Sequence, residues 1–212
     1  CGCDEPRWFE RKSAVFSAGL RDMDAILGRD DRLVAKLVDA ADKIDANFAA
    51  IVGTPVPAVI GTDYQALKRM CEKKTDLPIL AIDTDGMELY DKGEEKAYLA
   101  LFTAFAKEKY EVCKEKVGIL GMTPQDVSDL KAADKVREEL KKEGKEAICY
   151  GMGDGLEAVE RASEAGKNIV VSAAALEVAK YLEKTFGTPY EIGYPAAGEL
   201  VPNLDYQGKK IL

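Results

Sequence analysis

The sequence predicts an α/β fold in which parallel strands alternate with helices that cover both faces of each sheet. Short apolar runs recur along the chain, and each is followed by a segment of helical periodicity. Loops that contain glycine, proline or aspartate follow most of these runs. Because strand and helix alternate repeatedly in this order, the pattern is typical of βαβ units rather than of an antiparallel sheet.

The first buried run has an unusual loop behind it. Phe48 to Val52 is a continuous apolar run that Gly53 ends, which is typical of a parallel strand buried on both faces. Pro55 and Pro57 cannot continue a β ladder, so residues 54–60 should form a rigid connection at the carboxyl end of this strand. Ligands bind at this edge of open α/β sheets, so the loop is the first place to look for a site.

Capping residues set the starts of the two helices that flank this strand. Gly61 permits a tight bend, and Thr62 or Asp63 can cap the helix that follows the loop. Asp30 or Asp31 can cap the helix that precedes the strand. The strand is therefore expected to follow one helix in the chain and to precede another.

The remaining elements are expected from the same signals. The later strands are Ile79–Ile82, Lys116–Leu120, Glu146–Tyr150, Asn168–Val171 and Pro189–Ile192, and the helices after residue 60 are 63–74, 93–106, 128–142, 156–165 and 173–186. We expect Rossmann-like parallel sheets in two units, residues 1–112 and 113–212. Residues 208–212 are similar to the start of another strand, so the second unit is expected to be truncated or to end on an edge strand.

Composition limits the partners. The net charge of −8 and the pI of about 4.9 argue against a nucleic-acid partner, because phosphate binding relies on clustered lysine and arginine. No run approaches the roughly 18 apolar residues of a membrane span, and no targeting segment is present. We therefore expect a soluble, cytoplasmic protein with no membrane partner. The chain lacks a starting methionine, so its numbering is expected to begin inside a longer gene product or after processing.

Histidine is absent from the chain, which removes Ser-His and Cys-His nucleophile pairs and histidine metal sites. Any metal must be held by thiolate, carboxylate or groups from a partner. The five cysteines are an odd number, so a full disulfide framework is not expected. Cys71 and Cys113 lie in helical patterns and Cys149 at a strand end, so these three are expected in the core. Cys1 and Cys3 lie in an irregular start, where burial is not the default.

Two later loops carry groups that could bind a ligand. Residues 83–87 offer carboxylates, although solvated turn residues are the commoner use of such a sequence. Gly151-Met152-Gly153 lies between a strand and a helix and could hold a phosphate on backbone amides. It is not a full dinucleotide fingerprint, and Asp154 and Glu157 place negative charge where the phosphate would lie, so nucleotide binding is the less favoured interpretation.

The order of these motifs resembles the component 1 family of nitrogenase, which includes the molybdenum-iron protein subunits and their cofactor-assembly and reductase relatives. Residues 17–28 resemble a family segment with an acidic residue before an apolar pair and glycine. Residues 53–63 are similar to its Thr-Cys-x-x-x-x-Ile-Gly-Asp-Asp loop, and residues 80–86 to its strand ending in Thr-x-Gly. Residues 165–171 and 186–190 resemble its Ala-x-x-Asn-Leu-Val and Gly-x-Pro-Tyr pair. The resemblance covers nearly the whole chain.

The chain departs from the family pattern at its metal ligands. Pro55 stands where the family loop has a cluster-binding cysteine, and Ser172 stands where some members have a cofactor cysteine. Gly2-Cys3 resembles the glycine-cysteine that ends an upstream cluster-binding motif. A ligand role therefore carries over only to Cys3, together with Cys1. An iron-sulfur cluster wants about four ligands, so a second subunit or further residues would supply the rest.

The resemblance implies a subunit of a nitrogenase-like oxidoreductase that binds an iron-sulfur or metal cofactor at a subunit interface. Its implied partners are a related subunit, in a homo- or hetero-oligomer, and an ATP-dependent iron-sulfur reductase. The loops 54–62, 83–87 and 151–154 would line the cofactor cavity, and no catalytic residue is assigned. The implied cofactor-binding residues are Thr54, Pro55, Gly61, Thr62, Asp83, Thr84, Gly151, Gly153 and Ser172, with Cys3 and Cys1 as metal ligands.

Three other interpretations stay open. The chain could hold substrate or cofactor without redox chemistry, as an assembly scaffold of the same fold does. It could be an exported small-molecule or metal-complex binding protein with a lipid on Cys1, although no polar tether follows that residue. It could also be a silent paralogue that keeps the fold for pairing, for which Pro55 and Ser172 are the best arguments.

Overall fold

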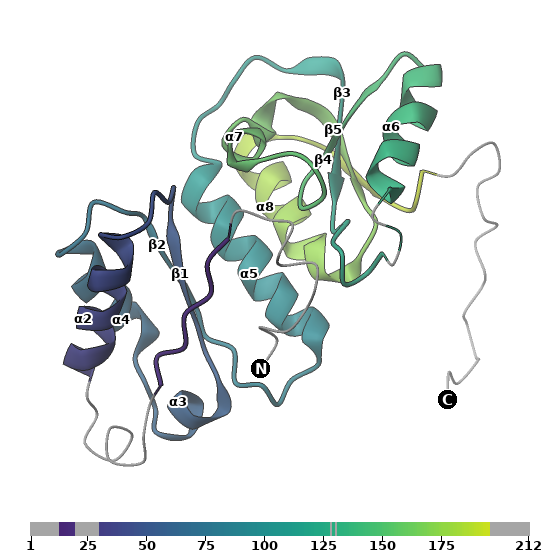
Figure 1. Cartoon of the computed structure of the whole chain (residues 1–212). Helices are drawn as coiled ribbons and strands as arrows, with labels where there is room; N and C mark the ends of the chain where they lie inside the picture. Colours follow the sequence, from purple (N-terminus) through teal and green to yellow (C-terminus); the bar gives the residue numbers. More distant parts are fainter. Residues whose placement is uncertain (1–12, 20–29, 128, 130, 196–212) are drawn as a thin grey trace, which may run out of the picture. The chain divides into compact units, whose positions relative to one another are not determined.

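A computed structural model describes residues 13–19, 30–127, 129 and 131–195, and it divides the chain into two compact units, Cys1–Ala104 and Phe105–Leu212 (Figure 1). The sequence placed the division at residues 112 and 113. The segment before residue 113 is tied to the second unit because the Ser163 hydroxyl donates to the Glu108 carbonyl at 2.9 Å. The Tyr110 amide donates to the Ser163 oxygen at 3.0 Å, and the Tyr181 hydroxyl donates to the Ala106 carbonyl at 2.9 Å.

The first unit contains a two-stranded parallel sheet. Strand β1 (Ala49–Val52) pairs with β2 (Ile79–Ile82) in the register Ala49 to Ile79 through Val52 to Ile82. The helices are α2 (Asp30–Ala41), α3 (Pro55–Val59), α4 (Tyr64–Glu72) and α5 (Tyr90–Phe105). The core joins both strands to α2 and α4 and contains Val34, Ile51, Tyr64, Leu67, Cys71 and Ile79.

The prediction that β1 is buried on both faces is wrong. Ile51 is 7% exposed, whereas Val52 is 59% exposed and Ala50 is also exposed. Successive residues of a strand point to opposite faces of the sheet. Ile51 therefore faces the core beneath α2 and α4. On the opposite face, Ala50 and Val52 of β1 are exposed, although their partners Leu80 and Ile82 in β2 are buried. An apolar run alone could not distinguish one buried face from two.

The predicted rigid connection after β1 is a short helix, α3. Pro55 is at the first turn of this helix, where its missing amide hydrogen costs no intrahelical bond. Gly61 turns the chain with a positive φ of 70°, and the Asp63 side chain caps α4 by accepting from the Ala66 amide at 2.9 Å. The expected bend at Gly61 is confirmed, and Asp63 rather than Thr62 is the cap.

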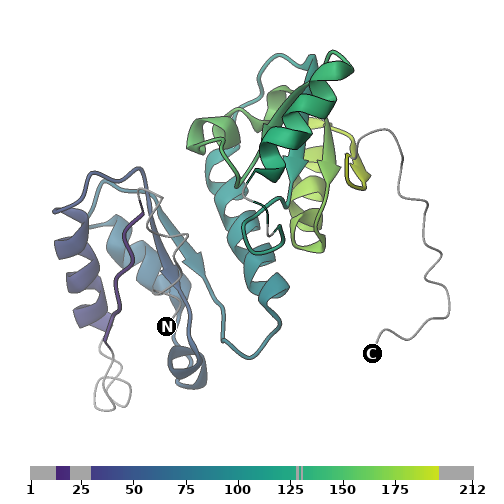
Figure 2. The same cartoon turned by 45° about the vertical axis from the view of Figure 1, so that its right-hand side comes forward.

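The second unit contains a four-stranded parallel sheet in the order β4-β3-β5-β6. Figure 2 shows this unit from another side, with the green helix α6 in front of the sheet. The predicted α/β class with parallel strands is thereby confirmed. A core between this sheet and α6 includes Val117, Ile119, Val136 and Leu140, and α8 contacts β3, β5 and β6. The strands are β3 (Cys113–Leu120), β4 (Glu146–Cys149), β5 (Ala165–Val170) and β6 (Tyr190–Ile192), and the helices are α6 (Ala132–Lys142), α7 (Leu156–Glu160), η3 (Ala162–Glu164), η4 (Ala173–Ala175) and α8 (Leu176–Phe186).

Two predictions for the second unit are wrong. Cys113 does not lie in a helix or in the core: it begins β3 and is only partly buried. The helix predicted to reach residue 165 ends at Glu160, and β5 begins at Ala165. A Cβ on Gly166 would lie 2.8 Å from the Lys114 Cα, so the glycine allows β5 to approach the start of β3. This contact with a distant strand outweighs the local helical propensity.

Among the residues that the structure describes, no helix is long and apolar enough to cross a membrane. The metal-ligand predictions for Cys1 and Cys3, and the strand expected at residues 208–212, lie outside the described ranges.

Candidate functional site

The predicted cofactor-binding residues fall into two sets, one in each unit. In the first unit they follow the carboxyl ends of β1 and β2, and in the second they follow β4 and β5. The first set is Thr54, Pro55, Gly61, Thr62, Asp83 and Thr84, and the second is Gly151, Gly153 and Ser172. Both sets therefore lie at the sheet edge where ligands bind in this fold class.

Gly53 and Thr84 close the carboxyl end of the first sheet. The Thr84 hydroxyl donates to the Gly53 carbonyl at 2.8 Å, and the Gly53 amide donates to the Ile82 carbonyl at 2.8 Å. A Cβ on Gly53 would lie only 2.1 Å from the Thr84 carbonyl oxygen and 2.7 Å from the Tyr64 hydroxyl. Only glycine fits this position. The Thr84 hydroxyl is therefore used to join the strand ends.

Pro55 contacts the second loop of this edge. A Cβ on Gly86 would lie 2.9 Å from the Cγ and Cδ atoms of Pro55, so the loop after β2 rests against the first turn of α3. Thr54 precedes α3 in an extended conformation and makes no capping bond with its side chain. Thr54 is exposed, so its hydroxyl is accessible from solvent.

Tyr64 lies behind this edge at the start of α4. The residue is 9% exposed, and this burial raises the pKa of its phenol. The backbone of Thr54 opposes that rise, and the negative charge of Asp83 adds to it. Tyr64 is not among the residues that the sequence predicted for the site. Its place directly after the Asp63 cap was the available signal, because the first turn of α4 must lie at the carboxyl edge.

The carboxylates of the loop after β2 bind groups of the protein itself. Asp85 accepts from the amides of Met87 at 2.8 Å and Glu88 at 3.1 Å, and these two bonds lower the pKa of Asp85. The Lys96 ammonium donates to Glu88 at 2.9 Å and to the Asp83 carbonyl at 3.2 Å. The bond to Glu88 raises the pKa of Lys96. This geometry supports a solvated turn, in which Asp85 organises the loop.

The glycine loop after β4 encloses a carboxylate of its own. Asp154 accepts from the Cys149 amide at 2.6 Å and from the Arg137 guanidinium at 2.8 Å. Arg137 also donates to the Met152 carbonyl at 3.3 Å, and a Cβ on Gly153 would lie 2.9 Å from its Nη2 atom. Asp154 thus occupies the position where a phosphate would meet the amide at the end of β4. The arrangement argues against a phosphate cradle at this loop.

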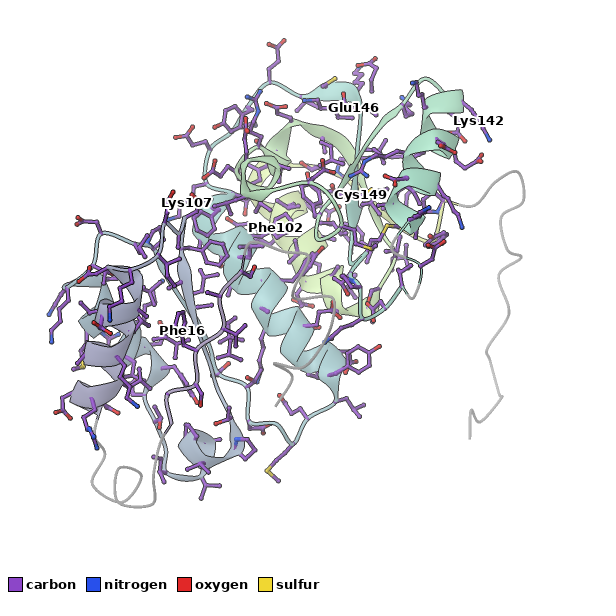
Figure 3. The ribbon with its side chains drawn as sticks, viewed as in Figure 1. Phe16, Phe102, Lys107, Lys142, Glu146 and Cys149 are labelled. Atoms are coloured by element: carbon purple, nitrogen blue, oxygen red, sulfur yellow. The ribbon has the colours of Figure 1, made fainter. Side chains whose placement is uncertain are left out.

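Cys149 is sealed beneath this loop. It is fully buried, and burial raises the pKa of its thiol to about 11. Its Sγ atom lies 3.9 Å from the Ala133 carbonyl of α6, and Figure 3 shows the residue between the sheet and that helix. A thiol in this state is a poor metal ligand at neutral pH because the thiolate is the ligating form. The expected core position of Cys149 is confirmed.

Ser172 caps the helical segment after β5. Its hydroxyl accepts from the Ala174 amide at 3.3 Å. Gly121 follows β3 with a positive φ of 87°, and a Cβ there would lie 2.8 Å from the Ser172 Cβ. The loops after β3 and β5 are therefore in direct contact.

A cavity of about 510 Å³ lies at the opposite edge of the second sheet, by the amino ends of β3 and β5. None of the predicted cofactor-binding residues lines it. Arg161 stacks over the Tyr110 ring, 5.3 Å from its centroid, and binds the buried Glu164. Cys113 lines this cavity at the start of β3, so its thiol lies away from the carboxyl edge of the second sheet.

The described residues do not form a metal site by themselves. No group of three or more histidine, cysteine, aspartate or glutamate side chains in the described ranges could hold a metal ion. Cys71 and Cys149 are buried in the two cores, and Cys113 lies at the wrong edge. The carboxyl edges offer hydroxyls, carboxylates and backbone groups but no thiolate of the described chain.

Comparison with known proteins shows which family has this sequence pattern. A family model described as nitrogenase component 1 type oxidoreductase matches residues 6–196. The chain is similar to proteins named nitrogenase iron-molybdenum cofactor biosynthesis protein NifE. The relative from Bradyrhizobium diazoefficiens is 23% identical over 212 residues, covering 89% of this chain and 36% of the relative. The relative from Clostridium pasteurianum is 26% identical over 181 residues, with coverages of 82% and 38%. The relative from Klebsiella pneumoniae is 26% identical over 220 residues, with coverages of 89% and 46%.

Solved structures show the same fold. A structure described as nitrogenase Cp1 at pH 6.5 superposes with a TM-score of 0.71 at 22% identity, covering 84% of this chain and 35% of that chain. The corresponding structure at pH 5 gives a TM-score of 0.70 at 22% identity, with coverages of 84% and 36%. The chain therefore spans less than half the length of the relatives and structures that it matches.

Proposed function

The chain belongs to the nitrogenase component 1 type oxidoreductase family, and from this premise we propose that it binds a metal-sulfur cofactor at an interface with a related subunit. One observation carries the proposal: the family match extends over residues 6–196 and so includes the loops at both carboxyl edges. Members of this family are oligomeric and, as a class, work with metal-sulfur clusters.

Thiolate ligands for the cofactor would have to come from Cys3, Cys1 and the partner. Pro55 stands in the family loop where a cysteine would ligate, and a proline ring has no atom that binds iron. An iron-sulfur cluster needs about four ligands, which two cysteines do not supply. The role proposed for Thr54, Gly61 and Thr62 is therefore to shape the loop beside the cofactor, through backbone groups and hydroxyls.

An assembly scaffold is the form of this function that we favour. The three relatives from Bradyrhizobium, Clostridium and Klebsiella are all named for cofactor biosynthesis. A scaffold has to bind its cofactor and later release it. A chain that supplies only part of the ligand set is suited to this because it holds the cofactor less tightly. The second candidate is a redox-active component that receives electrons from an ATP-dependent iron-sulfur reductase. We also propose a cytoplasmic location, where free thiols such as Cys71 and Cys149 stay reduced.

Iron and acid-labile sulfide content after strictly anaerobic purification tests the cofactor proposal. We expect both elements in the parent protein and their loss in the Cys3→Ala variant. Cys113→Ala is the matched control, because that thiol lies at the opposite edge of the second sheet and should not affect iron. Iron in neither protein after co-purification with the partner subunit and reconstitution with ferrous iron and sulfide would overturn the proposal. Equal iron in the parent and in Cys3→Ala would overturn the ligand assignment.

Electron delivery separates the two candidates. The loaded protein is mixed with a purified nitrogenase-type iron protein and ATP, and its absorption spectrum is followed. A scaffold is expected to keep its spectrum. ATP-dependent bleaching of the cluster absorption would favour the redox-active component.

A further inference from the structure

The first unit contains a buried hydroxyl group that makes no hydrogen bond. It belongs to Tyr64, which begins α4 and is 9% exposed. Its oxygen atom is buried, and no donor or acceptor in the part of the chain that the structure describes bonds to it. Most buried polar groups in folded proteins have a hydrogen-bond partner, so an unbonded hydroxyl in a core requires a physical explanation.

This hydroxyl lies at the carboxyl edge of the first sheet. A Cβ on Gly53, the residue that follows β1, would lie 2.7 Å from the Tyr64 hydroxyl oxygen and 2.1 Å from the Thr84 carbonyl oxygen. The hydroxyl is therefore close to the ends of both β1 and β2. The backbone of Thr54 and the charge of Asp83 both affect the pKa of the phenol, which places the loops after the two strands beside it.

The phenol keeps its proton at neutral pH. Burial is the largest cause of a raised pKa at Tyr64, and the negative charge of Asp83 adds to the rise. The backbone of Thr54 opposes the rise, although the two groups are not arranged for a hydrogen bond in this structure. Tyr64 is therefore suited to donate a hydrogen bond, and it is not suited to bind a metal ion as a phenolate.

An unbonded donor in this position makes the unit less stable than it would otherwise be. The hydroxyl has lost its hydrogen bonds to water and has gained none within the protein, which lowers the folding equilibrium constant by a factor of about 5 or more. Phenylalanine has the same ring and would avoid this loss. A ligand that brings an acceptor atom to the hydroxyl would recover the lost stability, and this recovery would strengthen its binding.

The loop beside the hydroxyl is open to such a ligand. Thr54 is exposed, and its side chain makes no capping bond to α3. The Thr84 hydroxyl holds the strand end by donating to the Gly53 carbonyl at 2.8 Å. The Tyr64 hydroxyl therefore lies beside a backbone segment whose next side chain faces solvent. Because bulk water does not reach the hydroxyl, a hydrogen bond formed there is stronger than one at the surface.

We propose that Tyr64 is a hydrogen-bond donor to the ligand of the first carboxyl edge and that its hydroxyl is bonded only when this ligand is present. The acceptor is an atom with negative charge, which in a metal-sulfur cofactor is a sulfur atom. This inference rests on the proposed function and adds to it a residue that donates to the cofactor without ligating a metal. Hydrogen bonds to cluster sulfur atoms tune the reduction potential, and they raise it because the reduced cluster carries more negative charge.

Exchange of tyrosine for phenylalanine in the metal-free protein tests the unbonded hydroxyl. Tyr64→Phe should raise the folding equilibrium constant by about threefold or more, which is measured as a higher urea midpoint. Tyr181→Phe is the matched control, because the Tyr181 hydroxyl donates to the Ala106 carbonyl at 2.9 Å, and this variant should lower the midpoint. A lower or unchanged midpoint for Tyr64→Phe would show that the hydroxyl already has a partner, such as a buried water, and would overturn the proposal.

The loaded protein tests the donor role. The parent and both variants are co-purified with the partner subunit and reconstituted with ferrous iron and sulfide. Redox titration and the rate of iron release to a chelator are then compared. Tyr64→Phe should have a more negative midpoint potential and should release iron about three- to tenfold faster, whereas Tyr181→Phe should match the parent in both measurements.

The outcomes separate this inference from the proposed function. Iron in the parent, with the same potential and release rate in Tyr64→Phe, would overturn the donor role and leave the proposed function intact. Absence of iron from the parent would overturn the proposed function and, with it, the role of Tyr64.

Discussion

Replacing Asp154 with alanine is expected to destabilise the second unit by about 3 kcal/mol, because the change removes two hydrogen bonds that involve an ionised group. The carboxylate accepts from the Cys149 amide at 2.6 Å and from Arg137 at 2.8 Å. Each such bond contributes about 1.5–3 kcal/mol when buried, and both side chains are about one-third exposed, so the lower part of the range applies.

The Asp154→Asn variant separates the two bonds. An amide oxygen can still accept from the Cys149 amide, whereas the ion pair with Arg137 is lost. We therefore expect a cost of about 1 kcal/mol for this variant. Asp134→Ala is the control: Asp134 also pairs with Arg137, at 3.2 Å, but its side chain is 71% exposed, so its removal should cost less than about 0.5 kcal/mol.

Urea unfolding followed by far-ultraviolet circular dichroism measures all three variants. The urea midpoint should be highest for Asp134→Ala, lower for Asp154→Asn and lowest for Asp154→Ala. The slope of the unfolding free energy against urea concentration should be unchanged. A loss of stability below about 1 kcal/mol for Asp154→Ala would refute the reasoning, because the two hydrogen bonds of Asp154 would then contribute little to holding the loop after β4. An equal cost for Asp134→Ala and Asp154→Ala would show that Arg137 does not depend on Asp154.

Three further predictions concern other parts of the molecule. Gly53→Ala should destabilise the first unit by about 3 kcal/mol, because the added Cβ would lie 2.1 Å from the Thr84 carbonyl oxygen. Gly155→Ala is the control, because a Cβ there meets no atom within 4 Å and should be tolerated. The melting temperatures of the two variants and the parent test this prediction. The hydrogen bond from Lys116 lowers the pKa of Glu164. The bond should therefore stabilise the fold at neutral pH, contribute less as the pH falls below the ordinary carboxyl pKa of 4.5, and contribute nothing once the pH is below the lowered pKa. The free energy of unfolding of Glu164→Gln and of the parent, measured against pH, tests this prediction. Cys113 should react with a thiol reagent at pH 8 in the native protein, and Cys149 should react only on unfolding.

Each of these predictions has a contrary outcome. Equal melting temperatures for the two glycine variants would mean that the strand end is not as tightly joined as the contact distances indicate. A stability difference between Glu164→Gln and the parent that grows toward low pH would reverse the sign expected from a lowered carboxyl pKa. Modification of Cys149 as fast as Cys113 in the native protein would contradict its burial beneath α6.

The sequence by itself determined the fold class and the positions of the candidate loops. Short apolar runs such as Ile79–Ile82 fix where strands form, and this strand has the predicted bounds. Gly61 and Asp63 specify the bend and the cap between α3 and α4, because both act through local backbone geometry. Properties that depend on neighbours in the chain were therefore accessible from the residues alone.

Only the tertiary structure decided which groups meet and which stay free. Thr84 and Gly53 are 31 residues apart, and Asp154 and Arg137 are 17 apart, so no local pattern predicts that each pair bonds. The same holds for the exposure of Val52 in β1, since an apolar run does not reveal which of its residues will be covered. Contacts between distant segments determine which side chains are buried, and burial raises the pKa of the Cys149 thiol. The candidate chemistry thus depends on long-range packing, whereas the fold class depends on local periodicity.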